Sequence, residues 1–389
     1  MRVVLDIVPM AAGRGGTGSG IWTYTLNLLR HLDACCPADL EIGVLMRRGQ
    51  LADLGFPLAR LKPIEVVWPG KGIISRLFWV HLALPLVCLW KRVAVLHKLA
   101  TDTPLWCSAR RITTLHDFYY EFLLEHTPPG QVRLYERLEQ FYFGFVTRLC
   151  VRHSQAIIVD SKAIGAELAR RYSSVAGRIT VVPLGAPPSS AAGVPQAGTG
   201  APARFVYVAK FMAHKGQFSA IRALELLATL RPALAAQVRL CFRGFSNDAA
   251  YYARLRAALA GSPLASQMEI IEYQHATGVE AIYRGATAAL LLSQYEGFGF
   301  PVVEAQSQGV PVICSDLPVL REVAGDAALF VAADHPEAAA AAMLKLLDES
   351  GCAQDLRTKG LANVQRFTWT ETARQTLAVY QKVLAGAAT

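Results

Sequence analysis

Short apolar runs alternate with longer segments of helical spacing along the whole chain. The runs carry apolar, often β-branched side chains at consecutive positions, which is typical of strands buried on both faces. They are Val3–Val8, Ile112–Leu115, Ala156–Val159, Ile179–Val182, Phe205–Val208, Val238–Phe242, Glu269–Ile271, Ala288–Leu292 and Val310–Cys314. Between them, Ile21–Leu32 and Ser219–Leu230 repeat apolar residues at helical intervals. This alternation predicts an α/β protein in which helices cover parallel strands.

One segment interrupts the pattern. Residues 186–203 are Ala, Pro, Gly, Ser or Thr at 16 of 18 positions, so they have little to bury and predict a flexible linker. The linker would separate a domain of residues 1–185 from one of residues 204–366, which suits a chain of 389 residues. Two doubly wound domains that face each other hold ligands in a cleft at the carboxyl ends of their strands.

The last segment, residues 367–389, carries its own helix signal. Thr368 and Glu371 have the spacing of a capping box, which predicts a helix from there to about Ala385.

The positive charge of the chain is concentrated in its first half. Residues 1–185 hold 22 Lys and Arg against 14 Asp and Glu, a net charge of +8, whereas the remainder holds 17 against 16. The excess favours a phosphate-bearing or anionic membrane partner for the first half, and a solvated basic surface is the alternative. We expect no nucleic-acid partner.

The eight cysteines show neither a Cys-x-x-Cys motif nor a metal-ligand spacing. Scattered cysteines in a chain of this size are typical of reduced, mostly buried thiols, so we expect a cytoplasmic protein. The first residues, Met1–Val8, have no basic segment before an apolar run and indicate a core strand rather than a signal peptide.

Leu77–Trp90 is the most apolar segment of the chain. Its 14 residues are fewer than the roughly 20 that a membrane-spanning helix needs, so we expect it not to span a bilayer. Two interpretations remain: a buried helix, or an interfacial helix with Trp79, Trp90, Lys91 and Arg92 at the lipid headgroups. The second would make the protein peripheral on the cytoplasmic face of the inner membrane.

Two glutamates flank a turn after the apolar run Ala288–Leu292. Glu296 precedes the turn Gly297-Phe-Gly-Phe300, and Glu304 follows Pro301, which suits the first turn of a helix. Gly297 and Gly299 allow a tight turn and a close approach of backbone to ligand. Carboxylates placed in this way can orient hydroxyl groups at two ends of an extended ligand. An ordinary strand–turn–helix with surface acids is the alternative.

Residues 293–330, including Glu296, Glu304 and Gly309-Val-Pro-Val, closely resemble the donor-binding region of family 4 glycosyltransferases. These are retaining enzymes of the GT-B fold, which has two Rossmann-like domains facing across a cleft. The resemblance implies that Glu296 contacts the transferred sugar and Glu304 the ribose of the nucleotide. It also implies that backbone amides of Gly297, Phe298, Gly299 and Phe300 meet the sugar or the diphosphate.

The resemblance extends to a strand and loop that clamp the diphosphate in this family. In Phe205-Val-Tyr-Val-Ala-Lys-Phe-Met-Ala-His-Lys-Gly, Lys215 falls on the family's lysine and Lys210 on its usual arginine. Lys210 keeps the charge of that arginine but lacks its planar, bidentate fork. Two solvated lysines are the alternative.

The first half resembles the acceptor-binding domain of the family. Thr113-Thr-Leu-His-Asp is similar to the family's histidine–aspartate turn, which implies that His116 hydrogen-bonds a hydroxyl of the transferred sugar and that Asp117 orients the loop. The Gly-rich loop from Gly13 to Tyr24 resembles the loop before the first helix, whose amides bind phosphate or shape the acceptor side through Gly16, Gly18 and Gly20. Trp22 departs from the family's small residue and would narrow the acceptor pocket.

The remaining resemblances are architectural. Val159-Asp-Ser-Lys and Val181-Val-Pro-Leu-Gly-Ala are similar to the last strands before the family's linker, and the C-terminal Phe-Thr-Trp stretch is similar to a helix that crosses back to the first domain.

The resemblance implies a retaining hexosyltransferase whose catalytic residues are His116, Glu296 and Lys215. Its best donor would be GDP-mannose, with a UDP-linked sugar as the alternative, and its acceptor a lipid-linked or growing bacterial glycan. The chain has no Asp-x-Asp motif, so we expect neither a metal nor any other cofactor. Lys210, Lys215 and helix N-termini would stabilise the leaving diphosphate. The other hypotheses are a GT-B nucleotide-sugar epimerase and a non-catalytic membrane scaffold.

Overall fold

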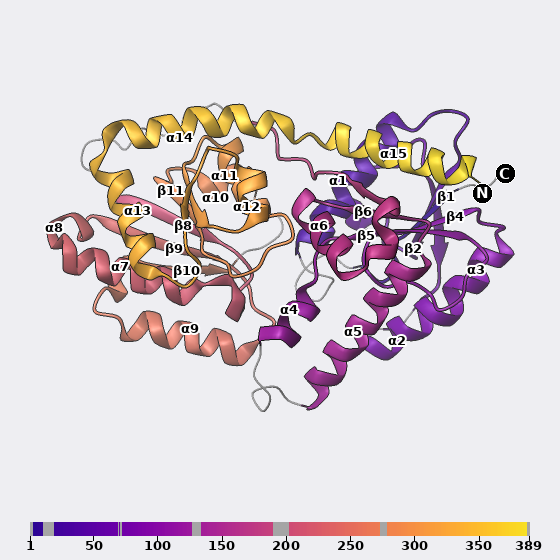
Figure 1. The fold of residues 1–389 in the computed structure, drawn as a ribbon, viewed down its shortest axis with the longest axis horizontal. Helices are drawn as coiled ribbons and strands as arrows, with labels where there is room; N and C mark the ends of the chain where they lie inside the picture. The colour runs from indigo at the N-terminus through magenta and orange to yellow at the C-terminus, as the bar shows by residue number, and fades with distance from the viewer. Residues whose placement is uncertain are drawn as a thin grey trace. The chain divides into compact units, whose positions relative to one another are not determined.

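The computed structural model describes residues 3–10, 19–68, 70, 72–126, 134–189, 202–272 and 278–386. The chain divides into two compact units, one of Met1–Gly185 with Thr368–Thr389 and one of Ala186–Phe367 (Figure 1). Of the predicted linker, residues 190–201 lie outside the described residues.

The first unit is built on one parallel sheet of seven strands in the order β3-β2-β1-β4-β5-β6-β7. The strands are β1 (Val3–Asp6), β2 (Ile42–Arg47), β3 (Lys62–Val66), β4 (Val95–Lys98), β5 (Arg110–Leu115), β6 (Ala156–Val159) and β7 (Ile179–Val181). The strand order reverses beside β1, which pairs with β2 on one side and with β4 on the other. Such a switch point is where doubly wound sheets bind ligands, at the carboxyl ends of the strands.

Helices cover the sheet of the first unit. They are α1 (Ser19–Cys35), α2 (Ile73–Phe78), the π-helical η2 (Trp79–Ala83), α3 (Leu84–Trp90), α4 (Tyr119–His126), α5 (Leu134–His153), α6 (Lys162–Arg171) and α15 (Trp369–Ala385), with two short 3₁₀ turns, η1 (Ala52–Leu54) and η3 (Ser173–Arg178). The predicted helix is confirmed, because the Thr368 side chain caps it by accepting from the Glu371 N–H and α15 ends at Ala385. The Glu371 carboxylate accepts from Arg374 and Gln375, so only the threonine half of the capping box is formed. Tyr380 of α15 bonds to His97 of β4 at 2.6 Å, which holds this C-terminal helix in the first unit.

The second unit contains a parallel sheet of six strands in the order β10-β9-β8-β11-β12-β13. The strands are β8 (Ala203–Val208), β9 (Val238–Gly244), β10 (Met268–Glu272), β11 (Ala288–Leu291), β12 (Val312–Ser315) and β13 (Leu329–Val331). Its helices are α7 (Gln217–Leu230), α8 (Pro232–Ala235), α9 (Ala249–Gly261), α10 (Val279–Tyr283), α11 (Phe300–Ser307), α12 (Pro318–Ala324), α13 (Pro336–Asp348) and α14 (Ser350–Asn363), with 3₁₀ turns η4 (Ala213–Lys215), η5 (Ala265–Gln267) and η6 (Val364–Arg366). Its core packs Phe205, Tyr207 and Phe242 of the sheet against Leu224 and Leu227 of α7.

The predicted α/β class with two doubly wound sheets is confirmed, and each predicted run lies on a strand. Four strands, β2, β3, β4 and β13, were not predicted. In β4 the polar pair His97–Lys98 interrupts the apolar pattern, although both side chains are buried. In β3, at the edge of the sheet, three of the five residues are exposed. All eight cysteines are free thiols, as the sequence predicts.

The apolar segment near Leu77–Trp90 is longer than the sequence indicated. One helical rod, α2-η2-α3, runs from Ile73 to Trp90 and has 18 residues with a mean hydropathy of 1.8, so it is long and apolar enough to cross a membrane by length and composition. The length argument against spanning was therefore wrong. However, Trp79, Val80, Leu84 and Cys88 pack on the sheet beside β1 and β4, so one face of this rod is part of the core of the first unit.

Candidate functional site

The residues predicted to bind the donor lie at the carboxyl ends of β8 and β11 in the second unit. The Lys215 Nζ lies 2.8 Å from Glu296 Oε1, and the Ser293 hydroxyl donates to the same oxygen at 2.7 Å. Lys215 ends the turn η4, and the Tyr207 hydroxyl fastens this turn by donating to the Lys215 carbonyl and accepting from the Leu292 N–H. The structure thus brings together two predicted residues that are 81 positions apart.

Gly216 allows this pairing. It has φ +70°, and a Cβ at this position would lie 2.1 Å from the Leu292 carbonyl oxygen. The turn after β8 therefore packs directly against the end of β11, and only glycine fits there.

Lys210 is the second predicted cation. Its ammonium lies 5.7 Å from the centre of the Phe245 ring. Burial, with a smaller contribution from the positive charge of Lys215, lowers the pKa of Lys210. The charged form of Lys210 is disfavoured here, so a bound phosphate would stabilise it, and the site suits an anion.

The turn Gly297–Phe300 leads from β11 into α11. Gly299 precedes the helix with φ +91°, and a Cβ there would lie 2.5 Å from Leu320 Cδ2, so this position also requires glycine. Phe298 is 5% exposed and packs edge-on against Phe300 and Phe367, so its ring belongs to the core and only its backbone is placed to contact a ligand. Pro301 lies in the first turn of α11, as predicted.

Glu304 lies inside α11 in apolar surroundings. Its Oε2 is 3.4 Å from the Tyr283 hydroxyl. Burial raises the pKa of Glu304 to about 7, although the Tyr283 hydrogen bond acts in the opposite direction. Hydroxyl groups that donate to this carboxylate would stabilise its charged form, so a ribose is a fitting partner.

His116 lies in the first unit, directly after β5. Because Leu115 and Val159 are paired in the sheet register, the next residues of the two strands, His116 and Asp160, are neighbours. His116 Nδ1 is 2.6 Å from Asp160 Oδ2, and its Nε2 is 3.0 Å from the Leu99 carbonyl oxygen. Both partners are acceptors, so both ring nitrogens must donate, which requires the protonated imidazolium.

The pKa of His116 agrees with this geometry. Burial opposes the charge, but the Asp160 carboxylate and the hydrogen bonds outweigh burial and raise the pKa. With both nitrogens engaged, His116 can bind a sugar hydroxyl only by exchanging one of these bonds. Asp117 is exposed and accepts from the Tyr119 N–H at 3.1 Å at the start of α4, which agrees with the loop-orienting role predicted for it.

The Gly-rich loop is described only in part. Gly16 and Gly18 lie outside the described residues, and Gly20 is exposed in the first turn of α1. Trp22 is 3% exposed, so a ligand can reach its indole only if the surrounding residues move.

Two neighbours of His116 were not singled out from the sequence. Asp160 was assigned an architectural role, yet it is 2% exposed, and its Oδ1 has no hydrogen-bond partner among the residues that the structure describes. Tyr24 of α1 packs edge-on against the imidazole with ring centres 4.8 Å apart, and its hydroxyl bonds to Thr114 at 3.0 Å. The sequence did contain a signal for Asp160, because it is an acidic residue directly after a fully apolar strand.

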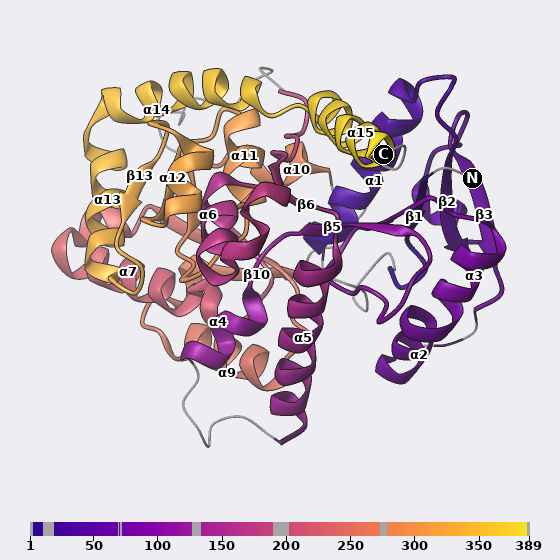
Figure 2. The ribbon, with the colours of Figure 1, turned by 45° about the vertical axis from the view of Figure 1, so that its right-hand side comes forward.

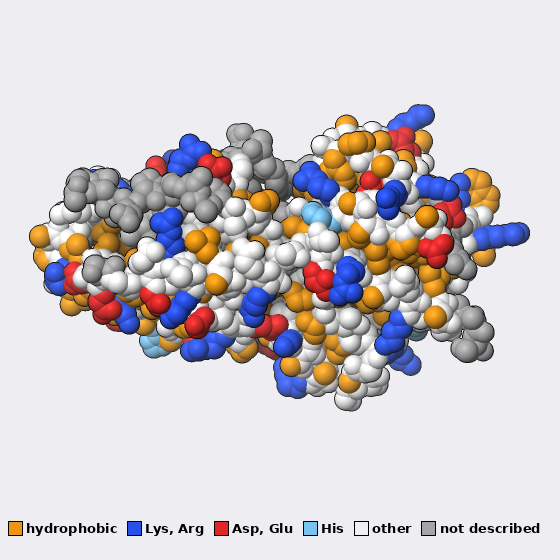
Figure 3. All heavy atoms as spheres, turned by 90° about the horizontal axis from the view of Figure 1, so that it is seen from above, with side chains coloured by type: hydrophobic (Ala, Val, Ile, Leu, Met, Phe, Trp, Pro, Cys, Tyr) orange, Lys and Arg blue, Asp and Glu red, His pale blue; other side chains and the backbone are white. Residues whose placement is uncertain are grey.

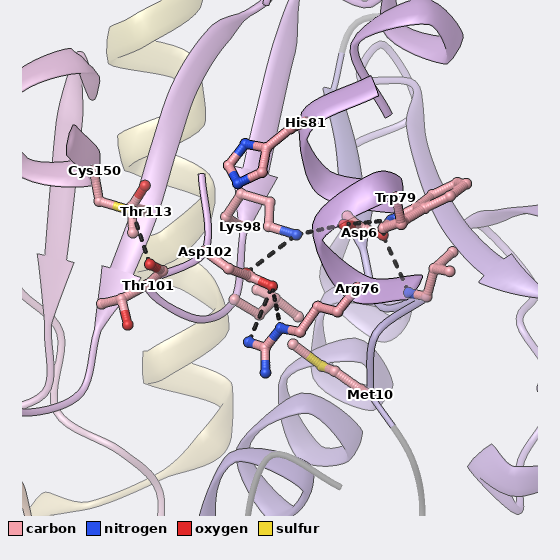
Figure 4. A network of polar contacts seen from close by, with 12 residues as sticks. Asp6, Met10, Arg76, Trp79, His81, Lys98, Thr101, Asp102, Thr113 and Cys150 are labelled. Carbon is pink, nitrogen blue, oxygen red and sulfur yellow. Dashed lines mark hydrogen bonds and ion pairs between the residues drawn. The ribbon is translucent and has the colours of Figure 1, made fainter. Parts of the chain in front are cut away.

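A buried charged network lies near the carboxyl ends of β1 and β4 (Figure 4). The Lys98 ammonium contacts Asp6 and lies 3.2 Å from Asp102, and the Arg76 guanidinium of α2 lies 3.0 Å from Asp102. The Trp79 indole N–H donates to Asp6 at 3.2 Å. Burial opposes the charge of Lys98, but the two carboxylates outweigh it and raise the pKa of Lys98. The network ties α2 and η2 to the two central strands.

Two family models together match most of the chain. "Glycosyltransferase Family 4" matches residues 18–190, and "Glycosyl transferases group 1" matches residues 197–362. The chain belongs to the family 4 glycosyltransferases. It is therefore a transferase, and the two matches meet near the boundary between the two units.

Curated relatives of this glycosyltransferase act in glycan synthesis. The O-antigen chain mannosyltransferase B of Escherichia coli is 37% identical over 100 residues, 26% of either chain. The GDP-mannose:cellobiosyl-diphosphopolyprenol alpha-mannosyltransferase of Xanthomonas campestris is 27% identical over 65% of this chain and 68% of the relative. The O-antigen chain mannosyltransferase RfbU of Salmonella typhimurium is 22% identical over 82% of this chain and 85% of the relative.

Solved structures establish the GT-B fold of this glycosyltransferase. Sucrose-phosphate synthase from Thermosynechococcus elongatus aligns with a TM-score of 0.73 at 19% identity, over 99% of both chains. Anabaena Alr3699/HepE, solved in complex with UDP and glucose, aligns with a TM-score of 0.71 at 14% identity, over 98% of this chain and 99% of that chain.

Proposed function

We propose that this glycosyltransferase moves a mannosyl group from GDP-mannose to a lipid-linked or growing bacterial glycan, with retention at the anomeric carbon and without a metal ion. The observation that carries the proposal is the Lys215–Glu296 pair, with its 2.8 Å contact and with Lys210 close enough for Lys215 to lower its pKa. The two lysines provide positive charge for a diphosphate, and Glu296 provides a carboxylate for sugar hydroxyls, at the same edge of the sheet.

The relatives support the choice of mannose. The two longer relatives described above are mannosyltransferases by name, and the name of one of them gives GDP-mannose as donor and a diphosphopolyprenol-linked acceptor. A UDP-linked hexose is the alternative donor, because the structural neighbour from Anabaena was solved with UDP and glucose.

In this mechanism, Lys210 and Lys215 stabilise the negative charge that develops on the departing diphosphate, and the N-terminus of α11 adds its dipole. Glu296 orients a hydroxyl of the sugar and Glu304 the ribose. The bond from the anomeric carbon to the phosphate oxygen breaks as the acceptor oxygen attacks from the same face. The departing phosphate oxygen takes the proton of the acceptor hydroxyl, so no enzyme base is needed.

The proposed independence from metal is supported by the cations of the site. Transfer measured with EDTA and with added Mg²⁺ tests this point. Equal rates are expected, and a rate that collapses in EDTA and returns with Mg²⁺ would contradict it.

The donor is tested by measuring mannosyl transfer from GDP-mannose to a diphosphopolyprenol-linked glycan, beside a panel of UDP-hexoses. We expect transfer from GDP-mannose and an α-linked product. Transfer from a UDP-hexose alone would refute mannose as the sugar. Binding of sugar nucleotides without any transfer would favour the epimerase, and no binding of any of them would favour the scaffold.

A further inference from the structure

An exposed apolar stripe runs along the rod α2-η2-α3. The side chains of Ile74, Phe78, Leu82, Leu86 and Trp90 follow one another at intervals of four residues and are 80%, 52%, 48%, 56% and 77% exposed. The opposite face of the rod is buried on the sheet, so the rod is apolar on both sides. Figure 2 shows α2 and α3 in the outermost layer of the first unit.

The π turn helps to align this stripe. In a regular α-helix, each step of four residues rotates a side chain by about 40°, because a turn takes 3.6 residues. The π-helical turn at Trp79–Ala83 holds more residues per turn and reverses part of that drift. The bonds of η2 to the core, from Trp79 to Asp6 and from His81 to the Tyr142 hydroxyl at 3.1 Å, fix the orientation of the rod.

A hollow of about 490 Å³ lies beside the stripe, at the carboxyl ends of β2 and β3. Its lining includes Arg47, Arg48 and Trp68. Trp68 connects the hollow to the stripe, because its ring stacks on Phe78 with centres 5.8 Å apart. The stripe and the hollow are therefore one continuous surface.

Two arginines bring positive charge to the hollow. Within the described ranges, no carboxylate forms an ion pair with Arg47 or Arg48. The Arg47 guanidinium donates to the neutral Met10 carbonyl at 2.8 Å, and Arg48 is exposed. The nearby carboxylates are those of Asp53, which is also in the lining, and of Glu65, which accepts from the Gly49 N–H at 3.4 Å. A ligand with a phosphate or diphosphate group fits these two guanidinium groups.

The other end of the stripe is basic as well. Lys91 and Arg92 are exposed directly after Trp90, and the Lys91 ammonium lies 4.3 Å from the centre of the Trp90 ring. Residues 47–92 contain eight Lys and Arg against two Asp and Glu. An apolar face bounded by aromatic and basic residues is typical of a helix that lies in the headgroup region of an anionic membrane. By contrast, basic and acidic side chains are interspersed on the face of the molecule in Figure 3.

We propose that the stripe and the hollow form a docking surface for an anionic lipid bilayer, in which the stripe enters the apolar boundary and the hollow holds the phosphate headgroup of a lipid. Only the identity of that lipid, the phosphate-linked acceptor, rests on the proposed function. Arg47 donates to the Met10 carbonyl, and Met10 shortly precedes the Gly-rich loop in the sequence. A headgroup bound by Arg47 would therefore lie close to Met10.

Flotation of the full chain with vesicles tests the proposal, and it requires neither donor nor transfer. The chain should float with vesicles that contain phosphatidylglycerol, less at high salt, and poorly with phosphatidylcholine alone. Leu82→Asp with Leu86→Asp should reduce binding about tenfold or more, and Arg48→Glu should reduce it about tenfold, because each loses apolar or headgroup contacts. Circular dichroism of each variant checks that it is folded.

Matched controls lie in the second unit. Leu230, which is 61% exposed at the end of α7, gives the variant Leu230→Asp, and the exposed Arg256 gives Arg256→Glu. Both should float like the unaltered chain. Equal loss in the controls, or no flotation of the unaltered chain, would overturn the proposal. A different result would also overturn it: the unaltered chain is a dimer by light scattering, Leu82→Asp dissociates that dimer, and the chain does not bind vesicles. The stripe would then bind a second copy of the chain.

The same data separate this inference from the proposed function. Flotation without mannosyl transfer upholds the docking surface and refutes the function. Transfer to a detergent-dispersed acceptor without flotation refutes the docking surface alone.

Discussion

His116 and Asp160 form a buried pair in which the imidazole Nδ1 lies 2.6 Å from the carboxylate Oδ2. The pair arises from the register of two neighbouring parallel strands, in which Leu115 is opposite Val159. The Leu99 carbonyl accepts from the other ring nitrogen, so the site is built for a charged imidazolium. The imidazolium and the carboxylate that neutralises it therefore lie together at the carboxyl ends of β5 and β6.

We expect Asp160→Asn to lower the pKa of His116, because the carboxylate outweighs burial in the unaltered protein. Since the folded pKa is raised, the pair stabilises the fold below the usual histidine pKa, and this contribution disappears as the pH rises through the folded pKa. The variant should lose about 1–3 kcal/mol near pH 6 and less near pH 9, as urea unfolding would measure. An NMR titration of the imidazole would report the pKa directly. Asp117→Asn is the matched control, and an equal pKa shift there would contradict this account.

We expect Glu304→Gln to stabilise the second unit at alkaline pH. Burial raises the pKa of Glu304 to about 7, so the folded protein holds a proton that the unfolded chain releases near pH 4.5. Stability therefore falls as the pH rises from about 4.5 to about 7, and the variant avoids this loss. The gain at pH 8 should be about 1–2 kcal/mol after allowance for the partial exposure of Glu304. Unfolding at pH 5 and pH 8 measures it, with the exposed Glu337→Gln as a control that shows no pH-dependent gain.

The same variant should bind the donor more weakly, because an amide replaces the carboxylate proposed for the ribose. Isothermal titration with GDP-mannose at pH 8 tests this effect. Unchanged affinity would remove Glu304 from the donor site.

We expect Glu296→Gln and Lys215→Met each to lower kcat/KM for transfer by about 10²-fold or more, because each removes a charge proposed to act on the donor. The two residues share a 2.8 Å contact, so the double variant should lose less than the product of the two single effects. Steady-state kinetics of the four proteins measures the coupling. Strict multiplication of the effects would show that the residues act independently.

We expect Gly216→Ala to destabilise the fold by about 2–4 kcal/mol. The residue has φ +70°, and the added Cβ would meet the Leu292 carbonyl oxygen at 2.1 Å. The matched control is Gly351→Ala in α14, where nothing lies within 4 Å and alanine should stabilise the helix by about 0.5–1 kcal/mol. Thermal unfolding of both variants measures the difference. A neutral Gly216→Ala would refute the close packing of η4 on β11.

Features that depend on neighbours in sequence were accessible without the structure. The apolar runs located nine strands, and the capping pair Thr368–Glu371 located the start of α15, because burial periodicity and capping are local. These local patterns did not predict strands in which a polar residue is buried because it pairs with a residue elsewhere in the structure. Lys98 ends a fully buried strand because two carboxylates neutralise it: Asp102, four positions along the chain, and Asp6, 92 positions away.

The sequence by itself determined the α/β class, the turn Gly297–Phe300 before α11 and the identity of the charged residues at the proposed donor site. The tertiary structure decided which charges pair: Lys215 with Glu296, Asp160 with His116, and Lys98 with Asp6 and Asp102. It also decided that the second face of α2-η2-α3 is exposed. The physical reason is that local propensity acts over a few residues, whereas strand order and register bring together side chains that are tens of positions apart.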